Sequence, residues 1–189
     1  MLKNKKKISA GFTLIELLIV MAILAILATV GLAFFTSAQA RGRDTKRKSS
    51  LKQISTALEL YYSDYETYPG TSNGKILGCP SAGGSVHTCD WGTMGSTSAF
   101  TDNVTVYMKI VPADPSGYNY YYRTVIVDTA NQGFQLYAHL ENSQDPSCLA
   151  GSNGSPNCTS PADIPSGVSC GTGVCNFAIT SANVTPTQE

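Results

Sequence analysis

An unbroken apolar run near the amino terminus, from Phe12 to Phe35, constrains this chain more than any other feature. Only Thr13, Glu16 and Thr29 interrupt its 24 residues with polar side chains. As an α-helix the run spans about 36 Å, enough to cross a hydrocarbon core of about 30 Å with some tilt. The sequence therefore predicts a single membrane-spanning helix at the start of the chain.

Charged residues are divided unevenly along the chain, although the formal net charge is zero. Ten basic and two acidic residues give positions 1–52 a net charge of +8, and positions 53–189 carry −8. The basic residues flank the apolar run, at positions 3–7 and 41–48. Because they lie beside an apolar segment rather than on a folded face, the pattern predicts no specific nucleic-acid partner.

A secretory signal peptide is the alternative interpretation of this amino terminus. Lysines, an apolar stretch and the small residues of Ala38-Gln39-Ala40 imitate a cleavable signal, which would release a soluble domain beginning at Arg41. The apolar part of such signals is about 7–15 residues long, however, and this run is much longer. Glu16 is also unusual for a disposable signal, so the anchor is favoured.

Glu16 is the one acidic residue of the apolar run. A carboxylate in the middle of a bilayer costs roughly 2.5–3.5 kcal/mol, and less near a helix end, so a cationic partner is expected. The leader lysines Lys3, Lys5, Lys6 and Lys7 are candidates in the intact chain. An amino group exposed at Phe12 of a neighbouring copy is the other candidate, and a carboxylate that merely reaches the interface is the unremarkable alternative.

The unbroken order Gly11-Phe12-Thr13-Leu14-Ile15-Glu16, after lysines and before a helix-length apolar run, closely resembles the class III signal of type IV pilins and pseudopilins. The resemblance implies that a prepilin peptidase cuts between Gly11 and Phe12 and N-methylates Phe12. It also implies that Glu16 pairs with the Phe12 amine of the adjacent subunit. That pair would neutralise the carboxylate and set the axial register of the filament.

This resemblance implies a structural filament subunit, neither an enzyme nor the holder of a cofactor. The chain would be a single-pass precursor in the cytoplasmic membrane, with its head outside the cytoplasm, and later part of a cell-surface type IV pilus. Its partners would be further copies or minor pilins, the peptidase, an inner-membrane assembly platform and membrane lipid. The fibre would serve adhesion, motility or DNA uptake, and the alternative is the major pseudopilin of a type II secretion system.

One departure from the family concerns the middle of the apolar run. Many pilins carry a proline there, which kinks or melts the helix, whereas this chain has Gly31 and Ala33 and no proline before Pro69. Glycine is a weaker helix breaker, which costs about 1 kcal/mol relative to alanine.

The helix is expected to continue beyond the membrane to about Tyr65. An apolar stripe at helical spacing comprises Leu51, Ile54, Leu58, Tyr61 and Tyr65. The residues between them form a polar face, namely Lys52, Gln53, Ser55, Glu59 and Asp64. Pro69-Gly70 is the stop signal. The basic turns at 41–48 are interpreted as a solvated or headgroup-contacting face, or one that meets acidic heads of neighbouring subunits.

The predicted fold is α+β and pilin-like, with one long helix packed on a small antiparallel sheet. We expect four segments: a leader (1–11), an apolar half-helix (12–35), an amphipathic half-helix (36–68) and a head (69–189). In the head we expect strands at about 118–128 and 133–140, joined by a turn at 131–133, and a last strand at 177–180. Residues 70–100 indicate a long surface loop, and residues 104–111 fit either a strand or a short helix.

The alternation of side chains in the second of these strands predicts a sheet with one buried face. Phe134, Leu136 and Ala138 are expected to pack on the apolar stripe of the helix. The residues between them, Gln135, Tyr137 and His139, are expected on the opposite face.

Six cysteines lie in the head, and their even number beyond a membrane segment indicates disulfides on an oxidising side. Fifteen pairings are possible, and the local ones, 79–89, 148–158 and 170–175, are favoured because each closes a short loop. The candidates are Cys79, Cys89, Cys148, Cys158, Cys170 and Cys175. Zinc held by Cys79, His87 and Cys89, with His139 available, is disfavoured by the spacing. No metal is assigned, although the resemblance leaves calcium open, with Asp128, Asn142 and Asp145 as oxygen donors.

Overall fold

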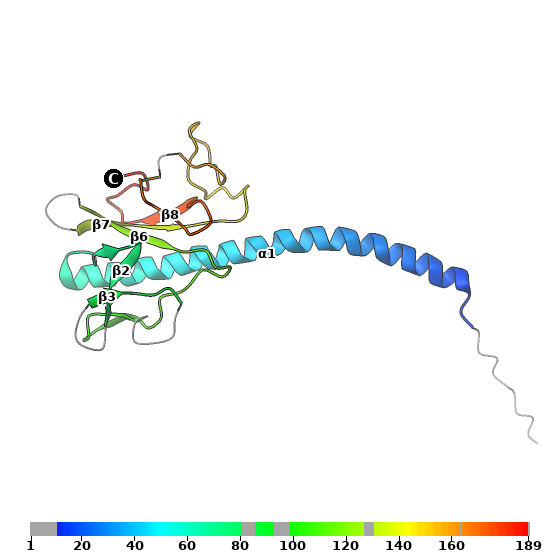
Figure 1. The fold of residues 1–189 in the computed structure, drawn as a ribbon, viewed down its shortest axis with the longest axis horizontal. Coiled ribbons are helices and arrows are strands. Elements are labelled where there is room, and N and C mark those ends of the chain that lie inside the picture. Colours follow the sequence, from blue (N-terminus) through cyan, green and yellow to red (C-terminus); the bar gives the residue numbers. More distant parts are fainter. Residues whose placement is uncertain (1–10, 81–85, 93–98, 127–130, 163, 189) are drawn as a thin grey trace, which may run out of the picture. The chain divides into compact units, whose positions relative to one another are not determined.

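The computed structural model describes residues 11–80, 86–92, 99–126, 131–162 and 164–188. The chain divides into two compact units, Met1–Gln39 and Ala40–Glu189. One helix, α1 (Leu14–Tyr65), supplies the described secondary structure of the first unit and continues into the second. The predicted α+β fold is confirmed by this helix and the small antiparallel sheets that follow it (Figure 1).

Helix α1 is 52 residues long, about 78 Å at 1.5 Å per residue. Its backbone stays helical through Gly31, in the region where many pilins have a proline. It ends at Tyr65, where Glu66 adopts a positive φ of 55°, and Pro69 follows shortly afterwards. The expected end near Tyr65 is therefore confirmed.

The apolar stripe of the second half of α1 forms the centre of the main core. Leu51, Ile54 and Leu58 are almost fully buried, together with Ala57. They belong to one cluster with Phe134, Leu136 and Ala138 of the sheet, which confirms that the helix stripe and the sheet share a core.

Two residues depart from the predicted faces of this helix. Tyr65 was assigned to the buried stripe, but it is 47% exposed and its hydroxyl donates to Asp102 at 2.7 Å. Ser55 was assigned to the polar face, but it is buried. A small hydroxyl fits against the core where a longer polar side chain would not, so the buried face is wider than the apolar pattern indicates.

The main sheet contains β6 (Tyr121–Ile126), β7 (Asn131–Ala138) and β8 (Phe177–Thr180) in the order β6-β7-β8. Both pairings are antiparallel, with Thr124 opposite Phe134 and Leu136 opposite Ile179. The last strand has the predicted bounds. The turn predicted at 131–133 is wrong, because Asn131 already pairs with Ile126. The connection at 127–130 lies outside the described residues.

The opposite face of β7 is buried as well, contrary to the one-sided sheet that the alternation predicts. Gln135 and Tyr137 are both fully buried. The Gln135 amide donates to the carbonyl oxygens of Thr185 at 2.6 Å and Gln188 at 2.9 Å, so the carboxyl-terminal segment covers this face. Tyr137 packs with the Cys170–Cys175 disulfide. His139 keeps more exposure, and its ring nitrogen Nδ1 bonds with the Val174 carbonyl oxygen.

Residues 70–100 are not the continuous surface loop that their composition predicts. They contain three short strands, β1 (Thr71–Ser72), β2 (Lys75–Pro80) and β3 (Val86–Thr88), in one antiparallel sheet. Ile76 and Cys79 of β2 are buried in the main core, which explains why this polar segment becomes ordered. A two-stranded ladder, β4 (Phe100–Thr101) with β5 (Val106–Met108), makes part of the ambiguous segment 104–111 a strand.

Candidate functional site

Thr13 and Glu16 close the amino-terminal end of α1 with reciprocal hydrogen bonds. The Thr13 backbone N–H and hydroxyl both donate to the Glu16 carboxylate, at 3.0 and 2.7 Å. The Glu16 backbone N–H donates back to the Thr13 hydroxyl oxygen at 3.3 Å. This arrangement is a capping box, which satisfies helix N–H groups that have no partner within the helix. Thr13 and Glu16 have the T-x-x-E spacing of this motif, a local signal beside the ion-pair and interface roles considered for Glu16.

Gly11 and Phe12 precede the helix as a short, open segment. An added Cβ at Gly11 would have no atom within 4 Å, and Phe12 is 81% exposed. The peptide bond between them is therefore accessible to a protein that approaches the end of α1. The leader lysines Lys3, Lys5, Lys6 and Lys7 lie outside the described residues.

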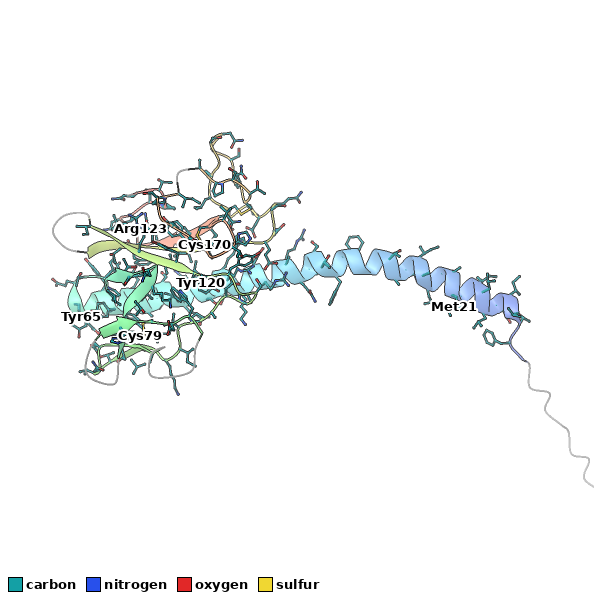
Figure 2. The ribbon with its side chains drawn as sticks, viewed as in Figure 1. Met21, Tyr65, Cys79, Tyr120, Arg123 and Cys170 are labelled. Atoms are coloured by element: carbon teal, nitrogen blue, oxygen red, sulfur yellow. A yellow bond between two sulfur atoms is a disulfide. The ribbon has the colours of Figure 1, made fainter. Side chains whose placement is uncertain are left out.

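The first half of α1 presents apolar side chains to its surroundings. Exposure is high all around the helix, for example at Leu14, Leu18 and Met21, of which Met21 is labelled in Figure 2. Between residues 14 and 40 the sequence has one charged residue, Glu16. In the described part of the chain, α1 is the one helix whose length and apolar composition suit a membrane span. Burial of this surface requires lipid or other protein chains.

Arg47 is the centre of an ion-pair cluster that joins the second half of α1 to the loops of the head. Its guanidinium is fully buried and contacts Asp44 at 2.7 Å, Asp114 at 2.6 Å and Glu141 at 2.7 Å. Ser116 also accepts a hydrogen bond from it, and the Tyr118 ring lies 5.3 Å away. Three carboxylates from distant parts of the sequence thus converge on one cation.

Neighbouring residues extend this cluster along the helix. Arg43 pairs with Glu141, and Asp44 accepts backbone N–H groups of Glu141 at 2.9 Å and Asn142 at 2.8 Å. Lys48 pairs with Asp145 at 2.7 Å. Residues 43, 44, 47 and 48 share one face of the helix, so all four contact the same loop. The cluster therefore fixes residues 141–145 against α1.

The charges of the cluster stabilise one another's ionised forms. Hydrogen bonds from Arg43 and Arg47 lower the pKa of Glu141 to about 2, although burial acts in the opposite direction. Burial likewise opposes ionisation of Asp114, but its bonds with Arg47 outweigh that effect and lower its pKa. The carboxylates in turn raise the pKa of Arg47 against the effect of burial. All these groups are charged at neutral pH.

The basic turns at 41–48 are thus not the solvated face that the sequence indicated. Arg43, Arg47 and Lys48 are paired within the chain, whereas Arg41 and Lys46 remain exposed. The spacing contains a signal for this burial, because Arg47 lies four residues before Leu51 and so continues the buried stripe. Asp44, three residues before Arg47, is a local partner. The other two could not be read from local sequence, because Asp114 and Glu141 follow at separations of 67 and 94 residues.

Of the candidate calcium ligands, Asp145 is paired with a lysine. Lys48 donates to both Asp145 oxygens, at 2.7 and 2.8 Å. Burial acts to raise the pKa of Asp145, but its hydrogen bonds with Lys48 and Ser147 outweigh that effect and lower the pKa. Asp128 lies outside the described residues. Among the described residues, no group of three acidic, histidine or cysteine side chains could hold a metal ion.

All six cysteines are in disulfides, which join Cys79 to Cys89, Cys148 to Cys158 and Cys170 to Cys175. These are the local pairs favoured from the sequence, and they remove Cys79 and Cys89 as zinc ligands. The first bond is part of the main core, the third packs with Tyr137, and the second lies with Leu140 in a small cluster of its own.

Comparisons with known proteins agree with the amino-terminal signal. Residues 6–32 match the prokaryotic N-terminal methylation motif. The chain is 30% identical over 118 residues to the type II secretion system core protein G of Pseudomonas aeruginosa, which covers 62% of this chain and 75% of that protein. It is 29% identical over 136 residues to the type IV major pilin protein PilA of Myxococcus xanthus, over 58% of this chain and 62% of PilA.

A third relative matches over a shorter stretch at higher identity. The type IV wide pilus major component PilA4 of Thermus thermophilus is 46% identical over 67 residues, or 35% of this chain and 50% of PilA4. The chain thus spans about three fifths of the length of the Myxococcus pilin and half of the Thermus protein. No solved structure matches the chain.

Proposed function

We propose a filament-forming role for this chain, which belongs to the family of type IV pilins and type II secretion pseudopilins. In this proposal the chain is a type IV pilin precursor, a structural subunit rather than an enzyme. It is held in the cytoplasmic membrane by the first half of α1, with the head outside the cytoplasm. Copies then join into a cell-surface filament that serves adhesion, motility or DNA uptake.

The observation that carries this proposal is the amino-terminal end of α1. An accessible Gly11–Phe12 bond is followed by a capped helix whose apolar side chains are exposed all around and whose single carboxylate is Glu16. Cleavage after Gly11 by the prepilin peptidase removes leader residues 1–11. N-methylation of Phe12 by the same enzyme then produces the mature amino terminus.

Assembly in this proposal buries the apolar half-helix, residues 12–35, against those of neighbouring copies. The Phe12 amine of one subunit meets Glu16 of the next and replaces part of the capping interaction with Thr13. The amphipathic half-helix, residues 36–68, and the head, residues 69–189, form the outer layer. An assembly platform in the inner membrane supplies the subunits, and minor pilins join the same filament.

Mass spectrometry of the protein from its native membranes tests the proposal. The expected product begins at N-methylated Phe12, and Gly11→Val should leave the chain starting at Met1. An added side chain at Gly11 meets no other atom, so this failure would reflect the peptidase and not misfolding. Gly42→Ala, at a position that is equally open, is the matched control and should be processed normally. A chain that begins at Arg41 would contradict the proposal.

A second candidate is the major pseudopilin of a type II secretion system, because core protein G of Pseudomonas aeruginosa is matched over three quarters of its length. The two candidates share the processing chemistry and differ in the assembled fibre. Loss of sheared surface fibres in a deletion strain would support the pilin. Loss of protein secretion with surface fibres unchanged would support the pseudopilin.

A further inference from the structure

The head contains a cavity of about 350 Å³ that the filament-forming role leaves unexplained. Its volume falls at the lower end of the range for small-molecule pockets, about 300–1,000 Å³. It combines aromatic and uncharged polar side chains with one lysine. The lining includes Asn73, Lys75, Trp91, Asn119, Tyr121 and Ser169.

Four separate segments build the cavity, and backbone hydrogen bonds help to hold them in place. The Tyr122 N–H donates to the Gly74 carbonyl oxygen at 2.7 Å, and the Asn119 N–H donates to the Cys170 carbonyl oxygen at 3.2 Å. The Gly92 N–H, next to Trp91, donates to the Val111 carbonyl oxygen at 2.7 Å. These bonds hold the lining side chains of the β1–β2 turn, of β6 and of the surrounding loops in place.

Two of the three disulfides fix the walls of the cavity. Cys79–Cys89 closes the loop that leads into Trp91, and Cys170–Cys175 closes the loop that carries Gly171 of the lining. The hydrogen bond from Asn119 to Cys170 joins this second loop to the segment just before β6. Tyr120 of that segment and Cys170 of the loop are labelled in Figure 2. Gly74 also allows a close approach, because a Cβ there would lie 2.5 Å from the Tyr121 ring. A pocket held in this way binds with little loss of conformational entropy.

The polar groups of the cavity suit a ligand rich in hydroxyls. Asn73 and Asn119 are exposed, and the described part of the chain provides no hydrogen-bond partner for either side-chain amide. Each amide can both donate and accept, which matches a hydroxyl group. The lysine does not favour an anion, because the Lys75 ammonium already pairs with Asp90 at 2.6 Å.

The aromatic groups supply an apolar surface beside these amides. Trp91 is partly exposed and meets Tyr120 edge to face, with ring centroids 5.8 Å apart. Tyr121 adds a second partly exposed ring to the lining. Aromatic rings contact the C–H faces of a sugar ring, while neighbouring amides bind its hydroxyls. A neutral sugar is the ligand class that uses both sets of groups.

We propose that this cavity is a binding site for a neutral saccharide, with Trp91 against the sugar ring and Asn73 and Asn119 bonded to its hydroxyl groups. The proposal does not depend on cleavage, methylation or filament assembly, because the site lies within one head. The test can therefore use the unassembled full-length chain, and its result is separate from that of the processing experiment.

The first experiment is a glycan array probed with the full-length chain in an amine-oxide detergent, which contains no sugar. The array should include neutral glucosides, galactosides, mannosides and N-acetylhexosaminides beside sialylated and sulfated forms. Binding to at least one neutral glycan is expected. An array with no bound glycan, or one with only the charged forms bound, would overturn the proposal.

Titration of the bound glycan then locates the site, because Trp91 is the single tryptophan of the chain. A saturable change in tryptophan fluorescence is expected. Asn119→Ala and Asn73→Gly should each weaken binding by about tenfold, since each removes roughly one hydrogen bond worth about 1.4 kcal/mol. Glycine preserves the backbone at Asn73, which has a positive φ of 51°.

Asn103→Gly is the matched control, because Asn103 also has a positive φ, of 72°, and lies outside the cavity lining. It should bind as tightly as the unchanged chain. Trp91→Phe loses the fluorescence signal, so its binding is measured by calorimetry. It should bind the glycan more weakly than the unchanged chain does. Unaltered affinity in Asn73→Gly, Asn119→Ala and Trp91→Phe would place the sugar elsewhere and overturn the assignment.

Discussion

The two halves of helix α1 share one backbone geometry but satisfy their side chains in opposite ways. Residues 14–29 and 34–35 expose apolar side chains, and the sequence from 14 to 39 has one charged residue, Glu16. Residues 40–65 bury a stripe through Leu51 and Leu58 and pair three of their basic residues with carboxylates of the same chain. The second half is thus complete within one chain, whereas the first half needs partners from outside.

This difference separates the residues that serve the fold of the head from those that serve assembly. Helices in water owe most of their stability to tertiary packing of an apolar face, which the second half has and the first half lacks. Substitutions in the first half should therefore affect membrane insertion and filaments, and those in the second half should affect unfolding of the head.

Glu16→Val should abolish filaments while it leaves the head intact. The substitution removes the one carboxylate that the Phe12 amine of a neighbouring subunit could meet, and it makes insertion of the helix into lipid easier rather than harder. We expect sheared fibres to fall to background, with unchanged amounts of protein in the membrane. Immunoblots of sheared and membrane fractions measure both quantities.

Thr29→Val is the matched control, since it also replaces a polar residue of the apolar run. Its hydroxyl donates only to the Ile26 carbonyl oxygen within the same helix, at 2.8 Å. Filaments should form normally from this variant. Normal fibres from Glu16→Val would contradict a role of the Glu16 carboxylate in assembly.

Arg47→Met should destabilise the head by roughly 3–5 kcal/mol, because it removes the cation that pairs with the buried Asp44 and Asp114 and leaves Glu141 with Arg43 alone. Urea unfolding of the full chain in detergent, followed by the fluorescence of Trp91, measures the free energy of unfolding. Arg41→Met removes an exposed arginine from the same helix and should change it by less than about 0.5 kcal/mol. Equal effects of the two substitutions would contradict the central role of Arg47.

Removal of the first disulfide by Cys79→Ala together with Cys89→Ala should destabilise the head by about 2–3 kcal/mol. The bond closes a loop with a sequence separation of 10, and a free chain gains entropy when that loop is opened. The same urea titration measures the loss. The helical signal of residues 14–39 in detergent should not change, and a parallel loss of that signal would mean that the two halves are not independent.

Elements with local signals could be predicted from the sequence. Helix α1 ends at the expected residue because Pro69 and the end of the 3–4 spacing coincide, and β8 is bounded by polar and small residues on both sides. The amino-terminal segment was likewise readable, because its motif is continuous from Gly11 to Glu16. The local cysteine spacing also favoured the disulfide pairs that the structure contains.

Features that depend on distant parts of the chain could not be predicted in this way. Burial of Gln135 and Tyr137 depends on the segment 170–188, which covers them by hydrogen bonds and a disulfide loop and has no apolar period. The strand β2 forms in a polar segment because Ile76 reaches the core of the helix. A single sequence does not reveal such contacts, because neither partner carries a local pattern.

Acid should weaken the head gradually and within a defined pH range. The pKa of Glu141 is about 2 in the folded chain against an ordinary 4.5, so folding favours the ionised carboxylate. A carboxylate with a lowered pKa stabilises the fold above its unfolded value, and this contribution is lost as the pH falls from about 4.5 towards 2. One proton changes the free energy of unfolding by no more than about 1.4 kcal/mol per pH unit. Urea midpoints between pH 7 and pH 2.5 should therefore stay level above about pH 5 and decline below it, more gently in Glu141→Gln than in the unchanged chain. Helix formation by residues 14–39 should show no such decline, and an equal decline there would contradict a division in which the ion pairs of α1 with the head stabilise the second half alone.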